Sequence, residues 1–133
     1  MKLFIFLSAI FLLTVSARNC NSNKTTAHAT NAEPIKYKAK LETKALCMNY
    51  TLRLLEGSID TAMIAANWTD ESTGKSYQNV FALGNPCIFP ASIEQGQDFY
   101  FLIDTSSVQK QCAVCMAYYP TPPKKLFIKV LDK

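Results

Sequence analysis

The sequence is poor in the groups that catalysis requires. It contains one histidine, His28, and only four glycines in 133 residues. Hydrolases that use a nucleophile, a base and an orienting group usually need an imidazole, and His28 stands in a polar stretch that offers no rigid geometry. No nucleophile elbow, zinc-protease motif, glycine-rich phosphate loop or EF-hand spacing occurs, and no two carboxylates are spaced as a catalytic pair. We therefore expect no enzymatic activity.

A dense positive charge is also missing. Lysine and arginine number 14 against 10 acidic residues, a formal net charge of +4, which is weaker than the basic footprint typical of nucleic-acid-binding domains. We therefore expect no nucleic-acid partner. The lysines form two groups, one at the first predicted strand (Lys36, Lys38, Lys40 and Lys44) and one at the C-terminus (Lys124, Lys125, Lys129 and Lys133). On neighbouring strands they would merge into a patch for heparin-like polyanions; alternatively, they protect edge strands from aggregation.

Long apolar runs are confined to the N-terminus. Lys2 precedes an apolar run over residues 3–15, which ends in the small residues Ser16 and Ala17. This pattern predicts a signal peptide over residues 1–17, cleaved after Ala17. A membrane-spanning helix would need about 20 apolar residues, so we expect a secreted, extracellular protein without a membrane span. Residues 18–33 are polar and without hydrophobic period, and are predicted to form a flexible arm.

The cysteines and sequons are consistent with that compartment. Most of the five cysteines should form disulfides, and the sequence leaves their pairing open: Cys20, Cys47, Cys87, Cys112 and Cys115. Because five is odd, one thiol is left free or joins a second chain, which allows a disulfide-linked dimer. Three sequons predict N-glycosylation, at Asn23, Asn49 and Asn67.

Cys112 and Cys115 have the spacing of both redox and zinc motifs. Structural zinc sites usually combine two close pairs of ligands, and the chain has no second pair. A redox motif would be expected in a chain of alternating strands and helices, which this sequence does not show. We interpret the two cysteines as structural, each paired with a distant cysteine, and expect neither a metal nor a cofactor.

Strand-like segments follow Pro34. Residues 35–42 alternate apolar and charged side chains, the pattern of a half-buried strand. Residues 50–55 predict a strand or a short helix, and further strand-like segments span 61–68, 77–83, 99–103 and 126–131. The aromatic and branched run at 99–103 is predicted to be buried on both faces. Six short strands separated by turns predict a mainly β domain over residues 34–133, either a small barrel or an antiparallel β-sandwich.

Two stretches resemble a known family. In residues 81–103, FALGNPCIFPASIEQGQDFYFLI, a cysteine is followed by an aliphatic position, a turn and an aromatic strand. In residues 115–126 a late cysteine precedes an aromatic-containing run and a proline. Both are similar to netrin-like domains, the family that includes tissue inhibitors of metalloproteases and a complement module. The resemblance implies a five-stranded OB-like β-barrel with a flanking helix.

The resemblance also implies disulfides and a function. In the family, the cysteine matching Cys87 bonds one near the N-terminus, which implies a bridge from Cys20 to Cys87. In the inhibitor branch the late cysteine, which matches Cys115, also bonds a cysteine near the N-terminus. With Cys20 assigned to Cys87, this implies that Cys47 pairs with Cys115 or Cys112. Netrin-like domains are mostly binding or inhibitory modules, so the main prediction is a secreted, non-catalytic module that binds an extracellular protein or glycan.

Two alternatives remain at this stage. The inhibitor branch of the family chelates a protease's zinc through an N-terminal cysteine, whereas Arg18 and Asn19 are expected to precede Cys20 here. Inhibition of that type therefore depends on where the signal peptide is cleaved. The other alternative is a lipid-binding β-sandwich, which the apolar strands favour.

Overall fold

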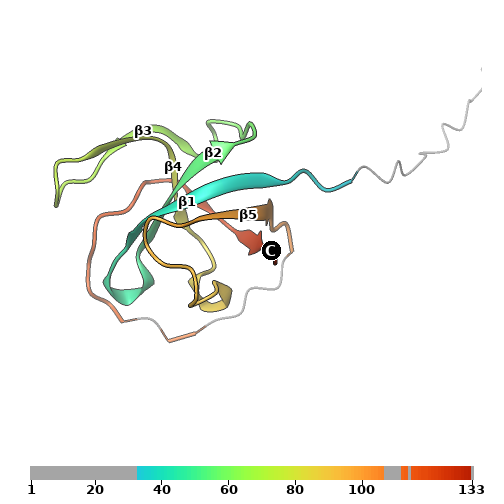
Figure 1. The fold of residues 1–133 in the computed structure, drawn as a ribbon. Helices are drawn as coiled ribbons and strands as arrows, with labels where there is room; N and C mark the ends of the chain where they lie inside the picture. Colours follow the sequence, from blue (N-terminus) through green and yellow to red (C-terminus); the bar gives the residue numbers. More distant parts are fainter. Residues whose placement is uncertain (1–32, 107–111, 114, 133) are drawn as a thin grey trace, which may run out of the picture. The chain divides into compact units, whose positions relative to one another are not determined.

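The computed structural model describes residues 33–106, 112–113 and 115–132 (Figure 1). The predicted signal peptide and almost all of the polar arm lie outside this part of the chain. The same holds for four individually named residues: Cys20, Asn23, His28 and Lys133.

The described residues form seven strands and two 3-10 helices. The strands are β1 (Tyr37–Lys44), β2 (Tyr50–Glu56), β3 (Ala65–Thr69), β4 (Ser76–Leu83), β5 (Asp98–Ile103), β6 (Lys125–Leu126) and β7 (Ile128–Val130). The 3-10 helices are η1 (Leu46–Met48) and η2 (Pro86–Ile88). The mainly β fold is confirmed. The expected flanking helix is not found in the described part of the chain, where only the short η2 lies between β4 and β5.

The strands belong to one mainly antiparallel sheet. Its order is β3-β4-β2-β1-β5-β7, and β6 pairs in parallel with β4. The segment from β6 to β7 therefore contacts β4 through β6 and β5 through β7. The sheet is not closed into a barrel, because Phe127 separates these two very short strands and belongs to neither. The open mainly antiparallel sheet is consistent with a sandwich-like class.

Strand β1 shows the alternation that the sequence predicts. Tyr37, Ala39 and Leu41 are buried, whereas Lys38 and Lys40 lie on the outer face. Because successive side chains of a strand point to opposite faces, one face packs on the core and the other meets solvent. The strand begins two residues later than expected, and Ile35 is exposed.

Strand β5 differs from its prediction. Phe99 and Phe101 are buried, but Tyr100 between them is half exposed, so the expected burial on both faces is wrong. The cause is the register with β1, which places Tyr100 opposite Lys38 on the solvent-facing side of the sheet. The Lys38 ammonium lies 5.9 Å from the centre of the Tyr100 ring.

Two other segments differ from the sequence prediction. Residues 61–63 form a turn instead of the start of β3, because Asp60 accepts hydrogen bonds from the backbone amides of Ala62 and Met63, each at 2.8 Å. The single strand expected over residues 126–131 is divided into β6 and β7 by Phe127.

The main core contains residues from all strands except β3. Aromatic rings pack against one another, with Phe81 and Phe101 at a centroid distance of 5.9 Å and Phe89 and Phe99 at 5.4 Å. The buried members of this core are Tyr37, Ala39, Leu41, Leu52, Ile59, Ile64, Phe81, Leu83, Phe99, Phe101, Leu126 and Ile128. A smaller cluster under the β3–β4 hairpin contains Ala65, Tyr77 and Val80, with Trp68 packed against it.

The turn of the β3–β4 hairpin is organised by a buried carboxylate. Asp70 accepts hydrogen bonds from the backbone amide of Ser72 at 2.8 Å and from its hydroxyl at 2.6 Å. Burial by itself would raise the pKa of Asp70, but the hydrogen bonds from Ser72 and Thr73 outweigh burial and lower it. Asp70 is therefore charged in the folded protein at neutral pH.

Candidate binding surface

Two disulfides connect the end of the sheet to an irregular segment. Cys47 in η1 is bonded to Cys115, and Cys87 in η2 is bonded to Cys112, with Cα–Cα distances of 4.9 and 5.6 Å. Each cysteine of the closely spaced pair thus bonds a distant cysteine, which confirms the structural interpretation. The predicted bridge between Cys20 and Cys87 is not found. The prediction is wrong because η2 lies beside Cys112, and the Cys87 sulfur is bonded to that residue.

The irregular segment is attached at several further points. The described residues from Cys112 to Lys124 contain no helix or strand. The side-chain amide of Asn49 donates hydrogen bonds to the backbone oxygens of Leu46 at 2.9 Å and Ala117 at 3.3 Å. The hydroxyl oxygens of Ser72 and Tyr119 lie 3.3 Å apart, within hydrogen-bond distance. The segment is therefore held to η1 and to the hairpin turn as well as by the disulfides.

Large apolar side chains gather around these bridges. Leu46 and Met48 flank Cys47, Ile88 follows Cys87, and Met116 and Tyr118 follow Cys115. Their exposed fractions are 76% for Leu46, 37% for Met48, 44% for Ile88, 99% for Met116 and 84% for Tyr118. The Cys47–Cys115 bridge holds η1 beside Cys115, and the Cys87–Cys112 bridge holds η2 beside Cys112 in the same irregular segment. We call these five residues the disulfide-linked surface.

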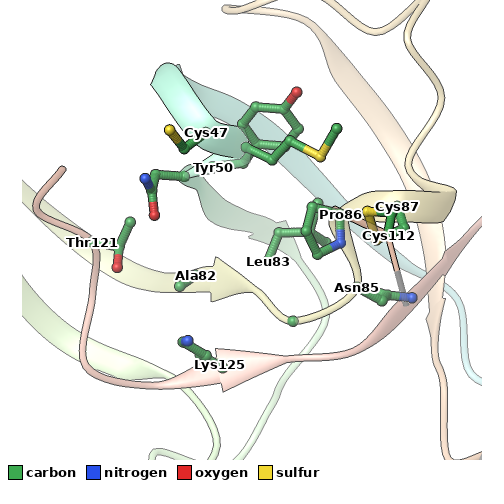
Figure 2. A pocket seen from close by; sticks show the side chains of 13 residues that line it. Cys47, Tyr50, Ala82, Leu83, Asn85, Pro86, Cys87, Cys112, Thr121 and Lys125 are labelled. Atoms are coloured by element: carbon green, nitrogen blue, oxygen red, sulfur yellow. A yellow bond between two sulfur atoms is a disulfide. The ribbon is translucent and has the colours of Figure 1, made fainter. Parts of the chain in front are cut away.

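A pocket of about 370 Å³ adjoins the disulfide-linked surface. Figure 2 shows Cys47 and Tyr50 on one side of it and Lys125 on the other. It is lined by Cys47, Met48, Asn49, Tyr50, Ala82, Leu83, Gly84, Asn85, Pro86, Cys87, Cys112, Thr121 and Lys125. Within the described part of the chain, no carboxylate lies within ion-pair distance of the Lys125 ammonium. The pocket therefore has a mixed polar and apolar lining with one cation, Lys125.

One polar residue of the pocket has a structural role. The Asn85 amide donates to the backbone oxygen of Ile128 at 2.7 Å, and its carbonyl accepts from the backbone amide of Ile128 at 3.1 Å. Asn85 thus satisfies both backbone groups of Ile128 as a neighbouring strand would. Its side chain supports β7 and offers little to a ligand.

The backbone of η1 has an unusual conformation. Cys47 and Met48 have φ angles of 57° and 58°, in the left-handed region that residues with a Cβ seldom occupy. Two such residues in succession need support from their surroundings. The Cys47–Cys115 bridge and the hydrogen bonds of Asn49 provide it. The exposure of Leu46 and Met48 thus depends on a supported, strained turn.

Three lysines of the first group, Lys38, Lys40 and Lys44, lie near carboxylates of the same chain. The Lys38 ammonium lies 3.2 Å from a Glu56 oxygen and 3.7 Å from Asp98, and Lys40 lies 4.0 Å from Asp98. The hydrogen bond and charge of Glu56 raise the pKa of Lys38. Lys44 likewise pairs with Glu94 at 3.1 Å. Lys36 precedes β1 and is exposed.

The two predicted lysine groups do not lie on neighbouring strands. Lys129 is on β7, and β5 separates this strand from β1. Lys124 and Lys125 lie at β6, which pairs with β4. These three lysines are exposed. Lys129 and a hydrogen bond from Ser106 lower the pKa of Asp104, the hydrogen bond being the larger cause. The structure thus does not unite the lysines by direct strand pairing.

The described residues contain neither a membrane-crossing helix nor a metal cluster. No helix in them has the length and apolar character to span a bilayer. In the same residues no three or more His, Cys, Asp or Glu side chains are grouped to hold a metal ion.

The exposed apolar residues were not singled out from the sequence, although a signal was present. Four of the five are immediate neighbours of a cysteine: Leu46 and Met48 of Cys47, Ile88 of Cys87, and Met116 of Cys115. Disulfides between short irregular segments leave such neighbours little room in a core. This pattern could have identified them.

Comparison with protein-family models, curated proteins and solved structures finds no match to the chain. Function is therefore inferred from the residues themselves.

Proposed function

We propose that the chain is a secreted, non-catalytic binding module whose disulfide-linked surface holds an extracellular protein. The observation that carries the proposal is the exposure of Leu46, Met116 and Tyr118 beside the Cys47–Cys115 disulfide. Contiguous exposed apolar groups mark interaction sites on soluble proteins, and Met and Tyr are enriched at such interfaces. Covalent bridges reduce the conformational entropy that binding would otherwise remove.

A protein partner is favoured over a polyanionic glycan. The lysines at β1 already contact carboxylates of the same chain, which lowers the positive potential available to a polyanion. The apolar residues of the disulfide-linked surface remain largely exposed to solvent. Lys125, at the edge of the adjoining pocket, favours a partner that places a carboxylate near an apolar contact.

We further propose that the sheet is related to the OB-like arrangement of netrin-like domains. The support is the pairing order: β1 pairs with β2 and β5, β2 pairs with β4, and the C-terminal segment pairs with β4 in parallel and with β5 antiparallel. Counting β6 and β7 as one interrupted strand gives a five-stranded ring, with β3 as an additional edge strand. Backbone hydrogen bonds that continue through Phe127 in solution would support this relation, and absence of the β4–β6 pairing would contradict it.

The binding proposal is tested by replacing the two most exposed residues of the surface. The double variant Met116→Ser with Tyr118→Ser should fold normally, since neither side chain is in the core. Leu55→Ser with Tyr100→Ser is the matched control, because both residues are partly exposed and lie elsewhere on the sheet. Immobilised protein is exposed to extracellular fluid of the source organism in roughly 1 M salt, where the Debye length is about 3 Å.

The expected result is a discrete protein that the wild type and the control retain and that the Met116/Tyr118 variant loses by tenfold or more. Retention that vanishes in high salt for all three proteins would contradict the proposal and favour the polyanion alternative. N-terminal sequencing of the secreted protein addresses protease inhibition, because a start at Cys20 is required for the zinc-chelating mechanism.

A further inference from the structure

Among the residues that the structure describes, strand β3 forms an open edge of the sheet. It hydrogen-bonds to β4 on one side and ends the strand order. Unpaired backbone groups at such an edge can pair with another chain, and proteins usually protect them with charged residues or proline. The sequence of β3, AANWT, contains neither. At the opposite end of the order, β7 carries the charge of Lys129.

The open edge contains a sequon in an accessible position. Asn67 and Thr69, the two defining residues of the sequon, are both exposed. Trp68 lies between them and packs inward, with its ring stacked on Tyr77 at a centroid distance of 5.9 Å. The Thr69 and Ser76 hydroxyls are 2.8 Å apart, which fixes the strand end. Among the described contacts, the Asn67 side chain makes no hydrogen bond, so a sugar on its amide would displace none of them.

The sequon at Asn49 has a different environment. Its amide nitrogen donates to both Leu46 and Ala117, and its threonine, Thr51, is fully buried. An N-linked asparagine retains a single N–H, so a glycan there would remove one of the two hydrogen bonds. These bonds hold η1 to the irregular segment. The folded structure thus accommodates a glycan at Asn67 without losing a side-chain hydrogen bond, whereas a glycan at Asn49 would remove one.

We propose that Asn67 carries an N-linked glycan that covers the β3 edge and prevents its pairing with a second copy of the chain. The inference rests on the proposed secretion, since this modification takes place in the secretory pathway. In the transfer, the Asn67 amide nitrogen forms a bond to C1 of the first sugar of a lipid-linked oligosaccharide. The bond between C1 and the donor's pyrophosphate breaks, the lipid pyrophosphate leaves, and the amide proton is released. A bulky hydrated glycan then occupies the space that a partner strand would enter.

The test uses the full chain secreted from eukaryotic cells, with Cys20→Ser in every sample so that a disulfide-linked dimer is not counted. Glycopeptide mass spectrometry is combined with light scattering over a range of protein concentrations. Asn67→Gln and Thr69→Ala each remove the sequon, Thr69→Ser preserves it, and Asn49→Gln is the matched control. Asn67→Lys removes the glycan but adds a charge to the edge.

The expected result is a glycan at Asn67 that is lost in Asn67→Gln and Thr69→Ala and kept in Thr69→Ser. Asn67→Gln and Thr69→Ala should at least double their apparent mass with rising concentration, whereas Asn67→Lys, Thr69→Ser and Asn49→Gln stay monomeric. An unmodified Asn67 in secreted protein overturns the inference. So does a monomeric Asn67→Gln, or association of Asn67→Lys. Failure of the chain to be secreted would instead overturn the proposed function, and is seen directly as absence from the medium.

Discussion

The outer face of β1 and the disulfide-linked surface differ in whether their side chains contact complementary groups of the same chain. On β1 the ammonium groups of Lys38 and Lys40 lie near carboxylates of the same chain. On the disulfide-linked surface Met116 and Tyr118 are almost completely exposed, and two covalent bridges fix the segments that carry them. Charged side chains that already contact an opposite charge of the same chain are less available to a partner. This difference is the reason why we propose the disulfide-linked surface, and not β1, as the site of partner binding.

The two regions also differ in what stabilises them. Exposed ion pairs contribute little to folding stability, since solvent screens the charges and the side chains lose freedom. Disulfides restrict the unfolded chain and contribute more as the enclosed loop lengthens. Removing a bridge should consequently affect the protein more than any change among the β1 lysines.

The largest expected effect is the loss of the Cys47–Cys115 bridge. The two cysteines are 68 residues apart, and the loop-entropy relation gives a loss of about 4 kcal/mol for Cys47→Ser with Cys115→Ser. Cys87→Ser with Cys112→Ser, 25 residues apart, should lose about 3 kcal/mol. Urea unfolding monitored by tryptophan fluorescence measures both. Losses below about 1 kcal/mol for the longer loop would contradict the stabilising role assigned to the bridge.

A smaller effect is expected at the hairpin turn that contacts the irregular segment. Asp70→Asn keeps an acceptor but loses the charge, and should reduce stability by about 1 kcal/mol at pH 7. Because the folded pKa of Asp70 lies below its unfolded value near 3.8, the wild type has this stability above that value and loses it as pH falls through the folded pKa. The difference between wild type and variant should therefore shrink below about pH 4. A difference independent of pH would show that the charge is not responsible.

Thr51 should show an effect of similar size and opposite sign. Its hydroxyl is buried and has no hydrogen-bond partner in the described residues. An unsatisfied buried hydroxyl costs about 1 kcal/mol, so Thr51→Val should be more stable by roughly that amount. Thr51→Ser, which keeps the hydroxyl and loses the methyl group, is the control and should be destabilising. A destabilised Thr51→Val would indicate an unrecognised partner for the hydroxyl, such as a buried water.

The smallest effect is expected among the β1 lysines. Lys38→Gln with Lys40→Gln should barely change the salt concentration at which the protein elutes from a heparin column. Lys124→Gln with Lys125→Gln, which removes two exposed charges without an ion pair among the described residues, should lower it more. The opposite order would show that the β1 lysines remain available to polyanions despite their carboxylate neighbours.

The strand pattern could be predicted from sequence because it depends on local alternation. Residues 35–42 revealed β1 through alternating apolar and charged side chains, and residues 77–83 revealed most of β4. The exposure of Tyr100 could not be predicted, because it depends on the register of β5 with β1. The division of the last strand at Phe127 depends on contacts with both β4 and β5, which are distant in sequence.

The candidate site was predicted only in part. The spacing of Cys112 and Cys115, without a second close pair, was sufficient to predict that each bonds a distant cysteine. The choice of partner was not predictable, since it depends on where η1 and η2 lie in three dimensions. The lysine groups were recognised, but their separation by β5 is a property of the sheet order.

The most direct test of the central claim is site-specific photo-crosslinking. A photoreactive amino acid is placed at position 118, on the disulfide-linked surface, or at position 40, on the outer face of β1, and each protein is irradiated in extracellular fluid. We predict a discrete, light-dependent adduct with a protein from position 118 and none from position 40. An adduct from position 40 with none from position 118 would contradict the assignment of partner binding to the disulfide-linked surface.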